Sequence, residues 1–167
     1  VDKVIGAANR NDIFSEFLDT ARFNPRKSVQ TISNAMDVGN PSNLERIIEL
    51  YGGDMEKMRK EISSTSYSDE QTKEGIREIY DKYNYIMDPH GAVGYLALKH
   101  YMLSNNIDLA NGIIVETAHP AKFKDIVENV IQNEVEIPGR LALCMDKEKK
   151  AVKLDSTFDS LKNFLMK

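Results

Sequence analysis

Apolar residues along the chain follow two spacings, one typical of strands and one typical of helices. Short continuous apolar runs at 4–8 and 113–115 predict buried strands, and the Ser/Thr-rich stretch at 62–67 predicts a short strand or a turn. The run at 113–115 is β-branched, so we expect a central strand that is buried on both faces. Helical spacing of apolar residues predicts helices near 13–18, 44–51, 55–62, 68–83, 89–97, 120–131 and 156–165.

Polar residues at several helix starts predict N-caps. Ser68 and Gln71 have the spacing of a capping box. A turn over 9–12 is expected to cap the helix that follows it, and Ser156 with Asp159 is expected to cap the last helix. The buried face of that last helix is predicted to consist of Phe158, Leu161, Phe164 and Leu165.

The end of the expected central strand carries candidate chemistry. Thr117 and His119 follow the strand directly, and Pro120 then opens a helix. In open α/β sheets, ligands bind at the carboxyl ends of the strands. A hydroxyl and an imidazole are therefore expected where a ligand would lie. His119 has a plain structural alternative, which is to cap the helix that follows it.

A second helix start combines an acidic residue, proline and histidine. From the sequence alone, Asp88 is expected to be an N-cap. Pro89 stands at an early helical position, where its missing N–H costs nothing. His90 is either a pocket residue or a partly buried residue satisfied by backbone groups. Small residues follow at the start of this helix, namely Gly91, Ala92, Gly94 and Ala97. They allow either a neighbouring helix or a flat cofactor ring to approach the helix backbone closely.

The stretch Gly-Asn-Pro-Ser-Asn at 39–43 also has two interpretations. It is a turn followed by Asn43 as the N-cap of the next helix. Alternatively, the N–H groups at the helix start and the side chains of Asn40 and Ser42 face an anion.

Three stretches of this sequence together resemble a known enzyme family, the threonine synthases. They are Thr-Ala-His-Pro-Ala-Lys-Phe at 117–123, Thr-Ile-Ser-Asn-Ala-Met-Asp-Val-Gly-Asn-Pro-Ser-Asn at 31–43, and Asp-Pro-His-Gly-Ala-Val-Gly-Tyr at 88–95. They stand in the family's order, and the likeness runs from the first residues to about Gln132, with a weaker likeness in the tail. The family uses pyridoxal 5'-phosphate (PLP) to convert O-phosphohomoserine and water to threonine and phosphate.

The resemblance implies a fold and a domain organisation. The expected fold is α/β and three-layered, with a mostly parallel sheet and helices on both faces. It would match the C-terminal part of the large domain of a PLP enzyme of fold type II, similar to tryptophan synthase β. Residues 1–137 would form that part, and 138–167 a C-terminal extension that packs on it. Val1, which stands where an initiator methionine would be, also suggests a fragment of a longer protein.

The resemblance also implies site residues. Thr117 would hydrogen-bond the pyridine nitrogen of PLP, and the pocket residues would be Asn40, Ser42, Asp88, His90 and His119. The lysine that holds PLP covalently and the Gly-rich phosphate loop belong to an upstream part of the family's chain and have no counterpart here. We therefore expect no catalytic residue in this chain, no turnover by the chain alone, and a need for the N-terminal part of the same protein.

Two alternative functions stay open at this point. One is another PLP-dependent lyase or deaminase of the same fold, and the other is a non-catalytic binding module. A proton-transfer role for His90 or His119 is open as well. No metal site is expected, because these histidines are far apart in sequence and no helical His-x-x-x-His pattern is present.

Composition narrows the set of partners. The net charge is -4 with both signs interspersed, which does not favour nucleic acid. No apolar run approaches membrane-spanning length, so we expect a cytoplasmic protein that does not bind membranes. The single Cys144 cannot form an internal disulfide. Apolar surface left uncovered at the boundary with the rest of the protein is expected to favour self-association.

Overall fold

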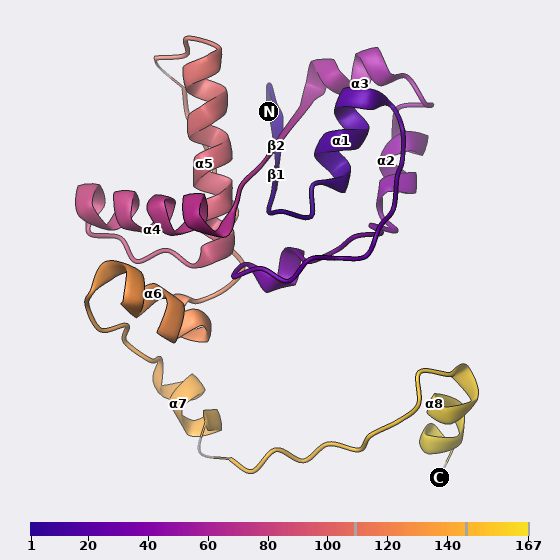
Figure 1. Cartoon of the computed structure of the whole chain (residues 1–167), viewed down its shortest axis with the longest axis vertical. Coiled ribbons are helices and arrows are strands. Elements are labelled where there is room, and N and C mark those ends of the chain that lie inside the picture. The colour runs from indigo at the N-terminus through magenta and orange to yellow at the C-terminus, as the bar shows by residue number, and fades with distance from the viewer. Residues whose placement is uncertain (109, 146, 167) are drawn as a thin grey trace. The chain divides into compact units, whose positions relative to one another are not determined.

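The computed structural model describes residues 1–108, 110–145 and 147–166. The chain divides into two compact units, Val1–Glu136 and Ile137–Lys167 (Figure 1). The elements of the first unit are β1 (Val4–Ala8), α1 (Ile13–Thr20), the 3-10 helix η1 (Asn34–Met36), α2 (Leu44–Leu50), α3 (Met55–Glu61), β2 (Ile62–Ser66), α4 (Asp69–Tyr83), α5 (Pro89–Ser104), the 3-10 helix η2 (Pro120–Phe123) and α6 (Lys124–Ile131). Those of the second are α7 (Gly139–Met145) and α8 (Phe158–Leu165).

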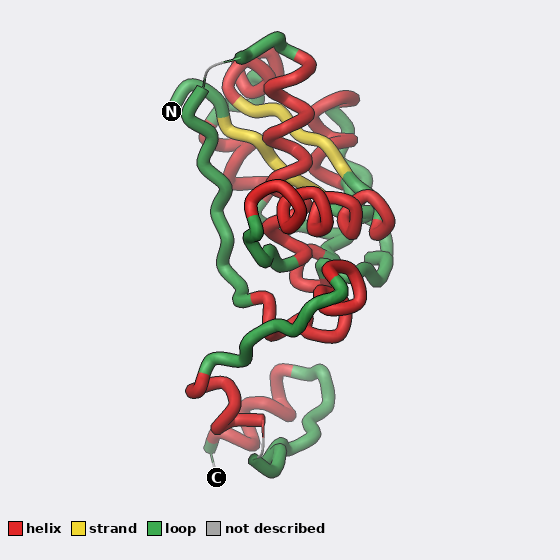
Figure 2. The backbone as a smooth tube through the Cα atoms, turned by 90° about the vertical axis from the view of Figure 1, so that its left-hand side faces the viewer, coloured by secondary structure: helices red, strands yellow, loops and turns green. Residues whose placement is uncertain are grey.

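The sheet of the first unit consists of β1 and β2, which pair in parallel from Val4 opposite Ile62 to Ala8 opposite Ser66 (Figure 2). The strands lie between α5 and α1, and each of these helices contacts both strands (Figure 1). Parallel strands with a helix on either side form three layers. The α/β class and the parallel pairing predicted from the sequence are confirmed.

The main apolar core lies beneath the helices that connect the two strands. Helices α1, α2 and α3 and strand β2 together form a cluster of buried apolar residues, namely Phe17, Leu18, Leu44, Met58 and Ile62. A second buried region forms where α4 packs against α5 and α6. This second region matters for the site, because it fixes the start of α5 relative to η2 and α6.

Two of the predicted N-caps form. The Ser68 side chain accepts a hydrogen bond from the Gln71 backbone N–H, and the Gln71 side chain accepts one from the Ser68 N–H, so the capping box of α4 is complete. Asp88 caps α5 by accepting a hydrogen bond from the His90 N–H at 2.9 Å. Local spacing alone therefore set the starts of the two longest helices.

Three other predicted caps differ from the expectation. Asp12 stands at the N-cap position of α1 but makes no capping bond, because its carboxylate pairs with Arg26. Asn43 stands at the N-cap position of α2 as predicted, but its backbone is helical, with φ −78° and ψ −11°, and its side chain makes no capping bond. Helix α8 is capped by Thr157, one residue after Ser156, since the Thr157 hydroxyl accepts the Ser160 N–H.

The predicted central strand at 113–115 is also wrong for this chain. No strand pairing forms there, and Ile113 and Val115 are 84% and 80% exposed. Ile114 and Glu116, between and after them, are partly buried, so burial alternates as in a strand with one covered face. A strand needs a neighbour for its backbone hydrogen bonds, and β1 and β2, the strands among the described residues, pair with each other.

The predicted buried face of the last helix is not buried. Among its residues, Phe158 and Leu165 are 77% and 70% exposed. The second unit spans only Ile137–Lys167, and a segment of fewer than about 40 residues rarely buries enough surface to form its own core.

Of the helices described, none has the length and apolar character needed to cross a membrane.

Candidate functional site

The start of α5 brings together two of the residues singled out in the sequence. Asp88 has no exposed surface, and its Oδ1 accepts the backbone N–H of His90. The same oxygen lies 2.7 Å from Nδ1 of the His90 ring. The second oxygen, Oδ2, is buried and has no hydrogen-bond partner among the described residues. A buried carboxylate oxygen without a partner is costly, so it marks this turn as a candidate site.

His90 connects three segments of the first unit. Its Nε2 accepts the backbone N–H of Ala35 in η1 at 3.2 Å, which requires a lone pair on Nε2 and places the proton of the neutral ring on Nδ1. That proton is directed to Asp88. The ring also packs on Phe123 in η2, with 4.9 Å between ring centroids. Both ring nitrogens are therefore engaged within the protein.

The position of η1 depends on a buried amide that the sequence analysis did not single out. Asn9 follows β1 and is 1% exposed. Its Nδ2 lies within hydrogen-bond distance of Thr31 Oγ1 at 2.7 Å, Ser33 Oγ at 3.0 Å and Asp37 Oδ1 at 2.9 Å. The available signal was an Asn-x-Asn pattern directly after a strand. This network fixes the segment that offers the Ala35 N–H to His90.

Thr117 and His119 follow the exposed residues at 113–115 and lie on the turn before η2. Thr117 is exposed, and its hydroxyl makes no hydrogen bond that the structure records in the described ranges. His119 is exposed and caps η2, because its Nδ1 accepts the Ala121 N–H at 3.1 Å. Its Nε2 therefore carries the proton of the neutral ring. No hydrogen bond or ion pair recorded in the described part of the chain joins either residue to Asp88 or His90.

Two of the small residues of α5, Gly91 and Gly94, meet the extended stretch at 112–117. A side chain at Gly91 would lie 2.8 Å from Cδ of Glu116, and one at Gly94 would lie 3.1 Å from Ile114. Glu116 in turn accepts a hydrogen bond from the Tyr85 hydroxyl at 2.6 Å, which raises the pKa of Tyr85. The neighbour that these two glycines accommodate is therefore the segment that leads to Thr117.

Asn40 and Ser42 lie apart from these contacts. Both are exposed, and they precede α2, a helix of 7 residues. The buried Gly39 beside them accepts the Arg26 N–H at 2.8 Å through its carbonyl, and a side chain at Gly39 would lie 2.8 Å from the Ser28 nitrogen. The turn is therefore held by close backbone packing, and the side chains of Asn40 and Ser42 make no hydrogen bond recorded among the described residues.

No group of three or more His, Cys, Asp or Glu side chains in the described ranges is placed to hold a metal ion. The polar residues described above lie on separate turns before helices, on a three-layer α/β scaffold. That combination is typical of α/β proteins that bind small molecules at turns between elements.

Comparisons with known proteins name the family. The family model "Threonine synthase, C-terminal" matches residues 91–165. Threonine synthase from Serratia marcescens is 37% identical over 166 residues, which cover 99% of this chain and 37% of that protein. The crystal structure of threonine synthase from Escherichia coli aligns with a TM-score of 0.85 at 33% identity, over 99% of this chain and 37% of that one.

A PLP-bound threonine synthase from Brucella melitensis aligns with a TM-score of 0.80 at 25% identity, over 99% of this chain and 40% of that one. The chain belongs to the threonine synthase family and corresponds to its C-terminal part. It spans 37% of the length of the Serratia marcescens and Escherichia coli relatives. The family resemblance carried by the three motifs is confirmed.

Proposed function

We propose that this chain is part of a threonine synthase, which converts O-phosphohomoserine and water to threonine and phosphate with the help of PLP. The observation that carries the proposal is the alignment of 99% of the chain with threonine synthases, both in sequence and in structure. The PLP-bound relative supports the choice of cofactor. When bound, PLP supplies an electron-withdrawing ring that stabilises negative charge on the substrate carbon attached to it.

Thr117 is the proposed partner of the PLP ring nitrogen. Its hydroxyl is exposed and has no recorded hydrogen bond among the described residues, so the group is available. A hydroxyl is a neutral partner that does not require a protonated ring, whereas a carboxylate would favour protonation and stronger electron withdrawal. The residues present therefore fit a cofactor that carries a ring nitrogen.

The two histidines have different proposed roles. His90 has both ring nitrogens engaged, so it holds the turn before α5 against η1 and η2, and Asp88 fixes its orientation. His119 uses only Nδ1 within the chain, so its Nε2–H is available to donate a hydrogen bond to substrate. Asn40 and Ser42 complete the pocket and bind an anionic group of the substrate through their side chains.

The remaining chemistry comes from the rest of the protein. The lysine that carries PLP and the Gly-rich phosphate loop would lie upstream, so the chain alone would be inactive. Residues 1–137 would form one wall of the cofactor cleft and 138–167 an extension packed on that wall. The segment 112–117 would pair with a strand of the remaining protein. We also propose a cytoplasmic location and no nucleic-acid or membrane partner.

Variants at Thr117 in the longer protein test the cofactor assignment. Thr117→Ser keeps a hydroxyl and Thr117→Val keeps the shape without it. We expect Thr117→Ser to bind PLP as the parent does and Thr117→Val to bind it about tenfold more weakly, as the loss of one buried hydrogen bond implies. Titration followed by PLP absorbance measures this. Equal affinities for both variants would overturn the assignment.

A substrate panel on the same protein tests the reaction. O-phosphohomoserine, serine and threonine are offered separately, and threonine, phosphate and oxo-acid products are measured. Threonine and phosphate from O-phosphohomoserine alone support the proposal. Oxo-acid formation from serine or threonine as the main reaction would instead assign a deaminase.

A further inference from the structure

The segment that leads to Thr117 is attached to α5 through alternate residues. Ile114 and Glu116 are partly buried. The residues that alternate with them are exposed, namely Ile113, Val115 and Thr117. Successive side chains of an extended stretch point to opposite faces. One face of the segment therefore packs on α5, and the other face, which carries Thr117, stays open.

Glu116 makes the closer of the two recorded contacts with the glycines of α5. A side chain at Gly91 would lie 2.8 Å from Cδ and 2.9 Å from Cγ of Glu116, whereas one at Gly94 would lie 3.1 Å from Ile114. Glu116 therefore occupies space that is open only because Gly91 has no side chain. Gly91 stands in the first turn of α5, where the partial positive charge of a helix N-terminus favours a carboxylate.

The Tyr85 hydroxyl fixes the same carboxylate. It donates a hydrogen bond to Oε2 of Glu116 at 2.6 Å, a length typical of a bond to a charged acceptor. Tyr85 lies in the loop that joins α4 to α5. In the described part of the chain, this is the only hydrogen bond recorded for residues 112–117. Glu116 is therefore the residue that ties the segment to the start of α5.

We infer that Glu116 is a positioning residue: held by Tyr85 and Gly91, it places the Thr117 hydroxyl at the ring nitrogen of PLP. One peptide bond joins Glu116 to Thr117, so an anchored Glu116 limits where that hydroxyl lies. Groups that bind a ligand must be held to within about 0.5 Å of the productive geometry. The inference rests on the proposed function, which assigns Thr117 to the cofactor. Neither Glu116 nor Tyr85 contacts PLP in this arrangement.

Titration of the longer protein with PLP, followed by absorbance, tests the inference. Glu116→Ala is expected to weaken PLP binding about fivefold and Tyr85→Phe about threefold, because each removes the hydrogen bond between the two residues. Glu116→Gln keeps an oxygen that accepts the Tyr85 hydroxyl, so its PLP affinity should stay within about twofold of the parent.

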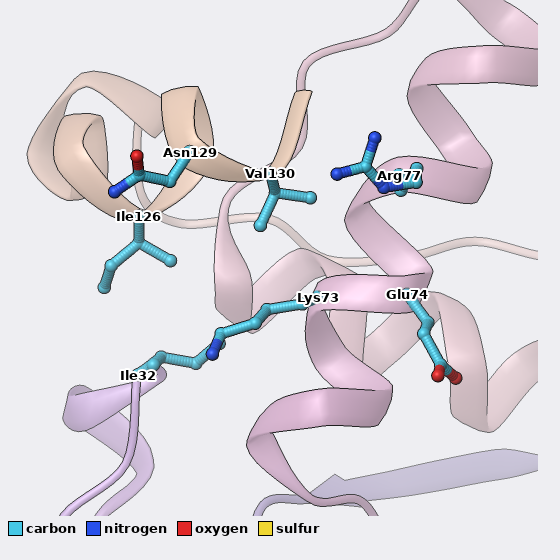
Figure 3. Close-up of a pocket in the computed structure, with 7 residues that line it drawn as sticks. All are labelled: Ile32, Lys73, Glu74, Arg77, Ile126, Asn129 and Val130. Carbon is cyan, nitrogen blue, oxygen red and sulfur yellow. The ribbon is translucent and has the colours of Figure 1, made fainter. Parts of the chain in front are cut away.

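Two matched controls make the same chemical changes away from this segment. Glu74→Ala removes an exposed glutamate that lines a cavity of about 460 Å³ where α4 faces α6 (Figure 3). Tyr83→Phe removes the hydroxyl of an exposed tyrosine at the end of α4. Neither side chain has a hydrogen bond recorded among the described residues, so neither variant should change the affinity for PLP.

The same titration in a Thr117→Val background separates positioning from a general loss of structure. Without the hydroxyl, Glu116 has nothing to place, so Glu116→Ala should weaken PLP binding by less than about twofold there. An equal loss of affinity in both backgrounds would show a merely structural role and overturn the inference. Glu116→Gln that binds PLP as weakly as Glu116→Ala does would overturn it as well.

Failure of the inference is distinct from failure of the cofactor assignment. If Thr117→Val weakens PLP binding while Glu116→Ala and Tyr85→Phe bind as the parent does, the inference alone is overturned. If Thr117→Val itself leaves the affinity for PLP unchanged, the assignment of Thr117 to the cofactor is overturned, and the positioning role of Glu116 with it.

Discussion

A single imidazole holds the start of α5 to two other segments. Replacing His90 by Ala removes the contacts to Asp88, to the Ala35 N–H and to Phe123 together. It leaves a buried carboxylate and a backbone N–H with fewer partners. We expect the free energy of unfolding to fall by about 2 kcal/mol. Urea unfolding of the chain, followed by circular dichroism, measures this.

His100→Ala is the matched control for that variant. His100 lies on the same helix and is exposed, with a 3.4 Å contact to Ser104 as its recorded side-chain hydrogen bond. Its removal should change the free energy of unfolding by less than about 0.5 kcal/mol. Equal destabilisation by the two variants would contradict the connecting role of His90.

The effect of Gly91→Ala on stability should depend on Glu116: destabilising when the Glu116 side chain is present and stabilising when it is removed. A side chain added by Gly91→Ala would lie 2.8 Å from Glu116 Cδ, so the Glu116 side chain must move away from Tyr85. We expect a loss of about 1 kcal/mol. In a Glu116→Ala background the space is open, and Gly91→Ala should stabilise the helix by about 0.5 kcal/mol.

A double-mutant cycle of these two changes, measured by chemical unfolding, tests the contact. The pKa of Tyr85 provides a second readout, since Glu116→Ala should bring it back down toward its ordinary value. Additive effects of the two changes, with the pKa of Tyr85 unaltered, would show that Gly91 and Glu116 do not touch.

At the scale of elements, α4 and α5 are joined by one carboxylate. Glu78 on α4 accepts hydrogen bonds from Lys82, from Lys99 at 2.6 Å and from the Tyr95 hydroxyl at 3.1 Å. The hydrogen bonds from Lys82 and Lys99 lower the pKa of Glu78 from 4.5 to about 2. Because Lys99 and Tyr95 lie on α5, the charge on Glu78 stabilises the packing of the two helices.

Acid should therefore weaken this packing in a defined range of pH. The folded state lowers the pKa of Glu78, so the stabilisation is present above the unfolded value of 4.5 and is lost as the pH falls through about 2. Glu78→Gln should lower the free energy of unfolding by about 1 kcal/mol at pH 7. The difference from the parent chain should shrink between pH 4.5 and 2.

Unfolding measured across that pH range checks the prediction, with Asp81→Asn as control. Asp81 is exposed on the same helix, with no ion pair recorded among the described residues, so its replacement should have little effect at any pH. A Glu78→Gln deficit that stays constant down to pH 2 would contradict the assigned cause.

The elements that the sequence predicted well are those decided by nearby residues. The capping box of α4 and the Asp-Pro start of α5 depend on groups within a few positions, so their spacing is sufficient. The strand expected at 113–115 depends on a neighbouring strand, which spacing cannot supply. The role of Asn9 was missed for a similar reason, because its partners at 31–37 are distant in sequence.

The candidate site was predictable to different degrees. Asp88 and His90 adjoin a helix start, and the structure brings them together. Thr117, Asn40 and Ser42 were singled out by their positions next to predicted elements and by family resemblance, and the structure leaves them exposed, with no recorded hydrogen bond to that pair among the described residues. Gly91 and Gly94 indicated a close neighbour, but the sequence could not identify Glu116 and Ile114, since both are more than 15 residues away along the chain.

At the scale of the molecule, exposed apolar surface predicts self-association of the isolated chain. Ile113 and Val115 lie on one face of an extended stretch whose backbone groups lack a strand partner in the described ranges. Such an edge is a template for pairing with another copy. Sedimentation velocity of the chain should therefore show species above the 18.9 kDa monomer.

Replacing Ile113 and Val115 by Ser together should return the isolated chain to the monomer. Leu50→Ser is the control, because Leu50 is 76% exposed but lies at the end of a helix rather than on an open edge. If Leu50→Ser reduces self-association as much as the double variant does, or if the parent chain is monomeric, the open edge is not the cause.

Phosphate release from O-phosphohomoserine with added PLP tests the central claim most directly. The assay compares the longer natural protein with the 167-residue chain. Release by the longer protein with none from the chain alone is the predicted result, because the lysine that carries PLP is proposed to lie outside these residues. No release from a folded, PLP-loaded longer protein, or release by the chain alone, would contradict the account.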